Sequence, residues 1–154
     1  MVAQDEDREV YEMQWSNDKV MAVDALARIG DERAIDLLVK ALSLESWHLR
    51  NRVVKALESV GKPAVERLIK SLKSGQWYVR EGASVALGNI GDVRAIEPLL
   101  ELLSDKNRSV TEAAKKAISQ ISSRHSPNQN ENDSSATHRA PGSSDDGPGG
   151  ATKA

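Results

Sequence analysis

The sequence has no cysteine, no phenylalanine and few aromatic residues of any kind. Its 154 residues include three tryptophans and two tyrosines. The absence of cysteine excludes disulfide scaffolds, zinc–cysteine modules, iron–sulfur centres and thiol catalysis. No stretch approaches the length of a membrane span, and residues 1–12 are acidic, which a secretory signal is not. We therefore expect a cytoplasmic protein with no membrane segment and with length for one domain.

Composition changes sharply after Ile121. Residues 122–154 contain no Val, Ile, Leu, Met, Tyr or Trp, and Ser, Asn, Gly, Pro and Asp dominate. Such a segment has little apolar surface to offset the entropy that the backbone loses on ordering. We predict a disordered, solvated tail, and its serines leave a tethering or modified tail open as the alternative.

Residues 1–121 instead place apolar residues at helical spacing, and this pattern repeats. Four segments have apolar residues at i, i+3, i+4 and i+7, which form one face of an α-helix. The second member of each set is an alanine, and successive alanines lie 31, 30 and 31 residues apart: Ala25, Ala56, Ala86 and Ala117. A nearly constant period of this length indicates an array of stacked structural repeats.

A turn and a second helix complete each unit. The first three periodic runs end at glycines, as expected where a helix stops in a left-handed residue: Gly30, Gly61 and Gly91. Asp31 and Asp92 can then cap the next helix, and Pro63 takes a first-turn position that needs no amide donor. Pro98 falls inside the third of these second helices, so that helix should begin late or bend.

Three segments carry a resemblance to a known family: Trp-Tyr-Val-Arg at 77–80, Ala-Leu-Gly-Asn-Ile-Gly-Asp at 86–92 and Arg-Ala-Ile-Glu-Pro-Leu-Leu at 94–100. They resemble HEAT repeats, and more narrowly the short HEAT-like repeats first described in phycobilisome lyases. The resemblance covers residues 15–121 and implies second helices that line a concave surface. The patterns of tetratricopeptide and ankyrin repeats are absent.

We accordingly predict an all-α fold, an α-α superhelix of about three and a half two-helix repeats followed by the tail. Arg108 takes the tryptophan position of the fourth unit and Ser122 its glycine position, as expected of a terminal repeat. The predicted boundaries are a capping segment at 1–14, repeats at 15–46, 47–76, 77–106 and 107–121 (partial), and the tail at 122–154.

No arrangement of catalytic residues stands out. The repeat region has one histidine, His48, and no His-Glu dipeptide, so the iron chemistry of HEAT-like deoxyhypusine hydroxylases is not implied. Phosphate loops, glycine-rich nucleotide motifs and nucleophile elbows are also absent. Lyase activity would rest on analogy of fold alone. We predict no enzyme activity, no metal and no cofactor.

Charged residues recur at two equivalent positions of the second helices. We call this set the second-helix column: Asp36, Glu66 and Glu97 and, one turn later, Lys40, Lys70 and Glu101. One interpretation is structural, with acid–base pairs Asp36–Lys40 and Glu66–Lys70 that each contribute about 0.2–0.5 kcal/mol. The other is that a binding partner contacts this ridge.

Aromatic and basic residues begin two corresponding first helices. Trp47 and Trp77 are each followed by an arginine three residues later, Arg50 and Arg80, and Tyr78 follows Trp77. These side chains could simply pack one repeat on the next. Because interface hot spots are enriched in Trp, Tyr and Arg, we predict that these five residues and the second-helix column bind a partner.

Charge is distributed unevenly between the repeats. Residues 1–46 have 5 basic and 11 acidic side chains, a net charge of −6, whereas residues 47–80 have 8 and 2, a net charge of +6. Adjacent repeats of opposite charge can attract each other. A basic repeat with aromatic residues could instead bind nucleic acid, although the acidic column interrupts the basic stripe and disfavours this partner.

The function that these features favour is a non-enzymatic scaffold or adaptor for protein–protein interaction. Two alternatives remain open: an accessory relative of the bilin lyases that acts on a tetrapyrrole-bearing protein, and a nucleic-acid-binding module. The fourth unit ends after one helix, so we expect Ala114, Ala117 and Ile118 to lack a covering helix. A homodimer or a docked partner at this C-terminal end would cover them.

Overall fold

The computed structural model describes residues 17–126, and all of the regular structure in this range is helical. The predicted cap at 1–14 and nearly all of the predicted tail lie outside the described residues. Within the range, no helix combines the length and the apolar character needed to cross a bilayer. Residues 17–122 pack as one unit.

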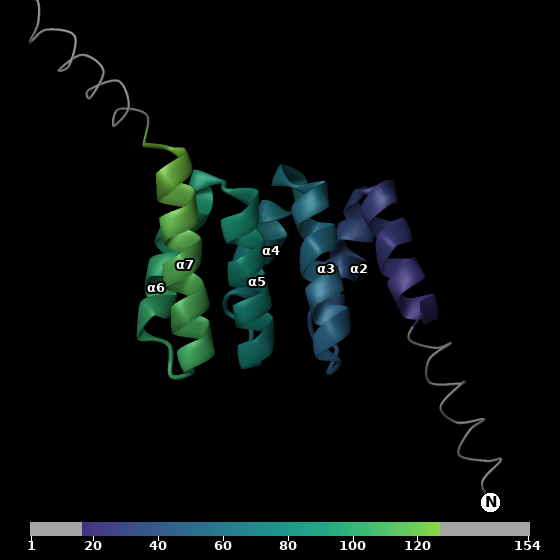
Figure 1. Cartoon of the computed structure of the whole chain (residues 1–154), viewed down its shortest axis with the longest axis horizontal. Coiled ribbons are helices and arrows are strands. Elements are labelled where there is room, and N and C mark those ends of the chain that lie inside the picture. Colours follow the sequence, from purple (N-terminus) through teal and green to yellow (C-terminus); the bar gives the residue numbers. More distant parts are fainter. Residues whose placement is uncertain (1–16, 127–154) are drawn as a thin grey trace, which may run out of the picture. The chain divides into compact units, whose positions relative to one another are not determined.

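The helices form antiparallel pairs joined by short turns (Figure 1). Short 3₁₀ turns precede α4 and α6 and follow α6: η1 (Lys62–Ala64), η2 (Val93–Ala95) and η3 (Leu102–Ser104). The helices in chain order are residues 17–29, α2 (Glu32–Ala41), α3 (Trp47–Val60), α4 (Val65–Ser71), α5 (Trp77–Ile90), α6 (Ile96–Glu101) and α7 (Arg108–Arg124).

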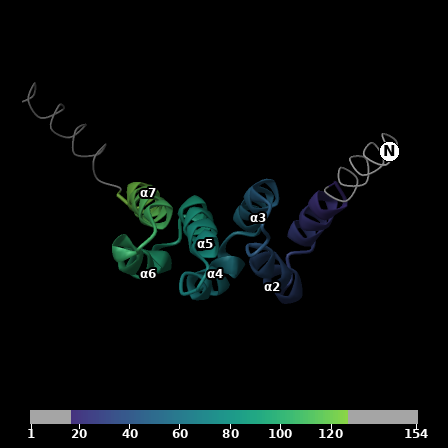
Figure 2. The same ribbon diagram turned by 90° about the horizontal axis from the view of Figure 1, so that it is seen from below.

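The pairs stack in two layers. The first helices of the repeats, residues 17–29 with α3, α5 and α7, form one layer, and the second helices α2, α4 and α6 form the other (Figure 2). The two-layer array confirms the predicted all-α solenoid of three and a half repeats. The last helix ends at Arg124, three residues later than the predicted boundary at Ile121.

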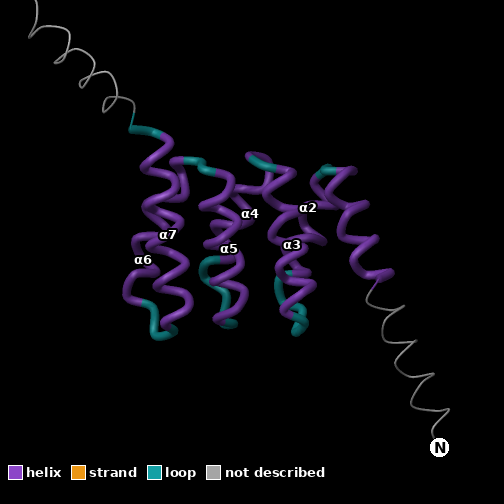
Figure 3. The backbone as a smooth tube through the Cα atoms, viewed as in Figure 1, coloured by secondary structure: helices purple, strands orange, loops and turns teal. Residues whose placement is uncertain are grey.

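The turns within the repeats form as their residues predict. Gly30, Gly61 and Gly91 have positive φ angles of 60°, 78° and 81°, which glycine adopts without a steric penalty. The Asp31 carboxylate accepts a hydrogen bond from the Ala34 amide at 2.8 Å and so caps α2. These turns lie along one edge of the layers, opposite the loops that lead from a second helix to the next first helix (Figure 3).

The prolines also act as expected. Pro63 lies in the first turn of η1, where a missing amide donor costs nothing. Pro98 is the third residue of α6, and the helix begins only at Ile96, after the 3₁₀ turn η2. The second helix of the third repeat is therefore short, with six residues against ten in α2.

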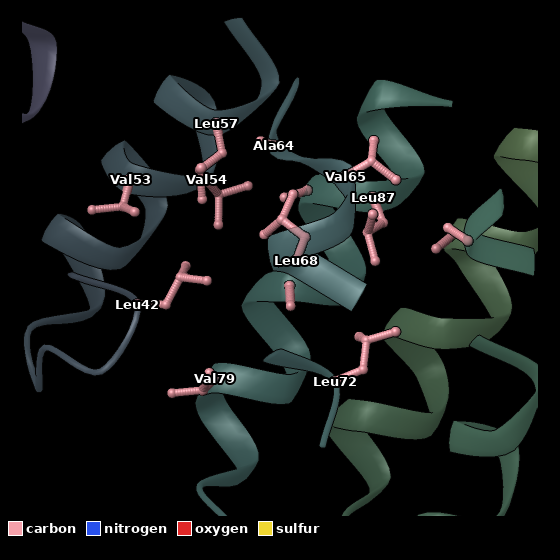
Figure 4. Close-up of a cluster of buried hydrophobic side chains, with 14 of the residues drawn as sticks. Leu42, Val53, Val54, Leu57, Ala64, Val65, Leu68, Leu72, Val79 and Leu87 are labelled. Carbon is pink, nitrogen blue, oxygen red and sulfur yellow. The ribbon is translucent and has the colours of Figure 1, made fainter. Parts of the chain in front are cut away.

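A single apolar core runs between the layers (Figure 4). Leu57 from α3, Leu68 from α4 and Leu87 from α5 are fully buried. Each such side chain contributes about 1.5–3 kcal/mol relative to an exposed one. The first repeat differs from this pattern, because Ala22 and Ile29 lie exposed at the end of the stack and Val23 is buried instead.

The prediction for the C-terminal end is wrong in two of its three residues. Ala114 and Ala117 are buried, because α7 lies so close to α5 that Gly88 contacts the backbone of Ala117. Ile118 is partly buried against the core. The apolar side chains left bare near this end come from α6 and η3 instead, with Leu100 48% and Leu103 40% exposed.

Candidate functional site

Two tryptophans stand at equivalent positions along one edge of the molecule. We call this edge, formed by the loops from second to first helices and the helix starts that follow them, the loop edge. Trp47 begins α3 and is 61% exposed, and Trp77 begins α5 and is 42% exposed. Tryptophan is rarely left this exposed without a reason, since its ring is large and mostly apolar.

Neighbouring side chains hold these aromatic rings together. The Trp47 ring meets His48 edge-on with 4.9 Å between ring centroids, and Trp77 meets Tyr78 in the same way at 5.7 Å. The Arg50 guanidinium of the second repeat lies over the Tyr78 ring of the third, 4.9 Å from its centroid. This cation–π contact joins the two aromatic pairs across the repeat boundary.

The two predicted arginines hold the loops of the edge in place. Arg50 Nη1 donates to the carbonyl oxygens of Leu44 and Glu45, each at 2.8 Å. Arg80 Nη1 donates in the same way to the carbonyl oxygen of Ser74, also at 2.8 Å. In both repeats the arginine therefore reaches back six residues and fixes the loop that precedes its helix.

Arg80 has a second, more buried partner. Its Nε and Nη2 donate to the two carboxylate oxygens of Asp105 at 2.8 and 3.0 Å, and the side chains are 17% and 9% exposed. The hydrogen bonds from Arg80 hold the pKa of Asp105 below its ordinary value. Arg80 thus has an intramolecular role and presents little surface to a partner.

Four residues of the second-helix column come together, and two do not. Asp36 and Lys40 of α2 and Glu66 and Lys70 of α4 line a shallow groove of about 630 Å³ between the two helices. Arg67 and Val39 also contribute to it. Glu97 and Glu101 lie on α6, one repeat further along, and are not part of this groove.

The carboxylates of the column pair between repeats rather than along their own helices. Asp36 accepts a hydrogen bond from Arg67 Nε, and Glu66 lies 3.7 Å from Arg94 Nη1. The predicted pairing with Lys40 and Lys70 is therefore wrong. Stacked helices lie about 8–10 Å apart, so a long arginine on the next repeat reaches the carboxylate.

A similar pair joins the first helices. Arg52 of α3 makes a two-pronged contact with Asp24, at 2.9 and 2.7 Å, and the hydrogen bond from Arg52 lowers the pKa of Asp24. Asp24 and Asp36 both belong to the acidic first repeat, and their partners to the basic second repeat. This pairing supports the interpretation that opposite charges help to join these two repeats.

The sequence analysis did not single out these ion-pair partners. A signal was available, because Arg67 lies 31 residues after Asp36 and Arg52 lies 28 residues after Asp24. Opposite charges about one repeat apart are therefore candidates for contact in a stacked array. Across residues 17–126, no group of three or more His, Asp or Glu side chains is placed to hold a metal ion.

Comparison with known proteins agrees with this architecture. HEAT repeats match the chain over residues 16–74 and again over residues 65–129. No curated protein matches it. Among solved structures, the crystal structure of an engineered protein from a structural genomics consortium is 24% identical, with a TM-score of 0.42 over 66% of this chain and 50% of that chain.

This chain thus spans half the length of that engineered protein. The two HEAT matches overlap and together extend from residue 16 to residue 129, which is well over half of the chain. The protein therefore belongs to the HEAT repeat family.

Proposed function

We propose that this protein is a non-enzymatic scaffold or adaptor that binds another protein through its loop edge. The observation that carries the proposal is the exposure of Trp47 and Trp77, 61% and 42%, at the same position of two successive repeats. Tryptophan is among the residues that contribute most to binding when a partner buries them.

The loop edge is held in one conformation before any partner arrives. Arg50 and Arg80 fix the two loops through their carbonyl groups, and the Ser46 hydroxyl accepts a hydrogen bond from the Leu49 amide at the start of α3. A surface of this kind loses little conformational entropy on binding, so more of the contact energy appears as affinity.

The spacing of the two rings indicates the form of the bound segment. Stacked helices lie about 8–10 Å apart, so rings at equivalent positions repeat at a similar distance. An extended segment rises about 3.3 Å per residue, and residues three apart would then meet successive tryptophans. The mixed charges of the groove between α2 and α4 provide a second contact surface for the same partner.

The basic residues of the middle repeat favour a protein partner over nucleic acid. Arg52, Arg67 and Arg80 are each bonded to an aspartate of the same chain. A cation that is already paired releases few counterions from a phosphate backbone and adds little to nucleic-acid affinity. The excess of positive charge in this repeat is in large part used inside the molecule.

The test is site-specific photo-cross-linking in the source cell. A photoreactive phenylalanine analogue replaces Trp47 or Trp77, and the matched control places it at Ile29, which is 61% exposed at the opposite edge. We expect the same protein adduct from positions 47 and 77 and none from position 29. The binding of that partner should weaken by about tenfold or more in Trp47→Ala/Trp77→Ala and stay unchanged in Ile29→Ala.

Three outcomes would overturn the proposal. Adducts with nucleic acid would favour the nucleic-acid alternative, and adducts that carry visible tetrapyrrole absorbance would favour the relative of the bilin lyases. A protein adduct of equal yield from position 29 would show that the loop edge is not the binding surface.

A further inference from the structure

The third repeat leaves apolar side chains bare at positions that the earlier repeats cover. Leu103 is 40% exposed, whereas Leu42 and Leu72, at the same position of the first two repeats, are 0% and 3% exposed. Leu100 is 48% exposed, whereas its equivalents Val39 and Ile69 are partly buried against the core.

The last first-helix shows the same difference. Ile118 of α7 is only partly buried, whereas Leu57 of α3 and Leu87 of α5, its equivalents, are fully buried. Val93 adds to the exposed set, because it is 48% exposed and its equivalent Glu32 lines the groove that faces α4. We call these four residues the C-terminal apolar face: Val93, Leu100, Leu103 and Ile118.

The common cause is the neighbour that each repeat has. In the first two repeats, a second helix of the following repeat lies beside these positions. The fourth repeat has its first helix, α7, but no second helix among the described residues. Residues 122–154 contain no Val, Ile, Leu, Met, Tyr, Trp or Phe, so they cannot supply the large apolar side chains that such a helix uses.

The chemistry of the missing helix can be taken from the helices that fill this position elsewhere. They present apolar residues at i, i+3 and i+7, as in Val65, Leu68 and Leu72 of the second repeat. They also place an arginine against a carboxylate of the preceding repeat, as Arg67 does with Asp36.

The same position on α6 is acidic and has no cation beside it. Glu97 corresponds to Asp36 and Glu66, which Arg67 and Arg94 contact, and no ion pair of Glu97 occurs within residues 17–126. A helix that covers the C-terminal apolar face would therefore gain by carrying a basic residue next to its apolar stripe.

We propose that the C-terminal apolar face binds an amphipathic helix of a partner protein, about ten residues long, with a basic residue flanking its apolar stripe. The bound helix takes the place of the second helix of the fourth repeat. This surface is separate from the loop edge, so it adds a second binding site of a different kind and does not depend on the first.

The chain itself supplies a probe for this site. A labelled peptide that copies residues 62–74 contains the apolar stripe and the arginine of α4, and its binding to the full chain is measured by fluorescence anisotropy. We expect Leu100→Ser and Leu103→Ser to weaken binding by about tenfold or more. Leu37→Ser is the matched control, since Leu37 is a second-helix leucine, 51% exposed, at the other end of the stack.

Charge reversal tests the recognition of the basic residue. Glu97→Lys should weaken binding of the peptide by about threefold to tenfold, and a peptide with Arg67→Glu should recover that loss with the Glu97→Lys protein. A peptide in which Val65 and Leu68 are serine keeps its charge and should not bind. Equal binding of this peptide would show mere electrostatic attraction and would overturn the proposal.

A short isolated helix is only marginally stable in water, so the decisive measurement joins the probe to the chain. Residues 62–74 are appended after Ala154, with residues 122–154 as the linker, which raises the effective concentration to the millimolar range. We expect the thermal midpoint to rise by about 4 °C or more relative to the same fusion with serine at the copies of Val65 and Leu68.

An identical midpoint in the two fusions would overturn the proposal. So would a dimer of the unmodified chain, seen by sedimentation, that Leu100→Ser dissociates, because a second copy would then be the occupant of this face.

Discussion

The two ends of the repeat array are joined to their neighbours by different physical means. The first repeat meets the second through two exposed ion pairs, Asp24–Arg52 and Asp36–Arg67, one in each layer. The third repeat meets α7 through the Gly88–Ala117 contact and through the largely buried pair of Arg80 and Asp105.

The difference indicates how much each boundary contributes to stability. Exposed ion pairs typically add about 0–1 kcal/mol and are screened by salt. A buried pair that loses one member costs about 3–5 kcal/mol, and a filled contact that must accept an extra methyl group costs about 1–3 kcal/mol. The C-terminal boundary should therefore be the more rigid, and the N-terminal one the more sensitive to conditions.

The largest effect is expected from the buried ion pair. Arg80→Ala should lower the free energy of unfolding by about 2–4 kcal/mol, because Asp105 is then left buried without its cation. Arg50→Ala is the matched control, since Arg50 fixes the equivalent loop but has no aspartate partner, and it should cost only about 1 kcal/mol. Urea denaturation measures both, and equal losses would contradict the assigned role of Asp105.

A smaller loss is expected at the close contact of α5 and α7. A methyl group at Gly88 would lie 2.7 Å from Ala117 Cα, so one helix must shift. Gly88→Ala should lower the free energy of unfolding by about 1–3 kcal/mol despite the better helix propensity of alanine. Gly75→Ala, where the added methyl group meets nothing within 4 Å, should change it by less than about 0.5 kcal/mol. A stable Gly88→Ala protein would show that α7 can move away without cost.

Acid should weaken the protein through its bonded aspartates. The hydrogen bonds that Arg94 donates hold the pKa of Asp92 at about 2, against an ordinary value of 3.8. A lowered pKa gives stability that is complete above the ordinary value and is lost as the pH falls from about 4 to about 2. Asp92→Asn keeps the cap but removes this contribution, about 1–2 kcal/mol at pH 7. Unfolding curves of the two proteins should therefore converge near pH 2, and a constant difference at all pH values would contradict this origin.

The smallest effects are expected at the N-terminal boundary. Arg52→Ala and Arg67→Ala should each cost about 0.2–1 kcal/mol, and the cost should largely disappear in about 1 M salt. Hydrogen exchange of residues 17–29 should accelerate in these variants, while exchange of α5 stays unchanged. A loss that persists in high salt would show that the arginine stems, rather than the charges, join the first two repeats.

Several features of the fold were readable from the sequence because they depend on residues near each other in the chain. The apolar spacing around Ala56 and Ala86 predicted the first helices, and glycines such as Gly91 predicted where they end. Caps and left-handed turns arise from contacts within four residues, so local sequence contains them fully.

The candidate site was predicted less completely. Arg50 and Arg80 occupy the same sequence position, yet only Arg80 has an aspartate within reach, and that aspartate lies 25 residues away. Asp36 was expected to pair with Lys40 four residues on, whereas its partner Arg67 comes from the next repeat. Pairings of this kind depend on the distance between stacked helices, which the local pattern does not contain.

The period of about 30 residues, the helix boundaries and the absence of cysteine chemistry were determined by the sequence alone. Which apolar residues remain bare was decided only by the tertiary structure. Leu42 and Leu103 are the same residue type at the same position, but one is fully buried and the other is 40% exposed. Burial depends on whether a neighbouring repeat lies alongside, and stacking brings that neighbour from a distant part of the chain.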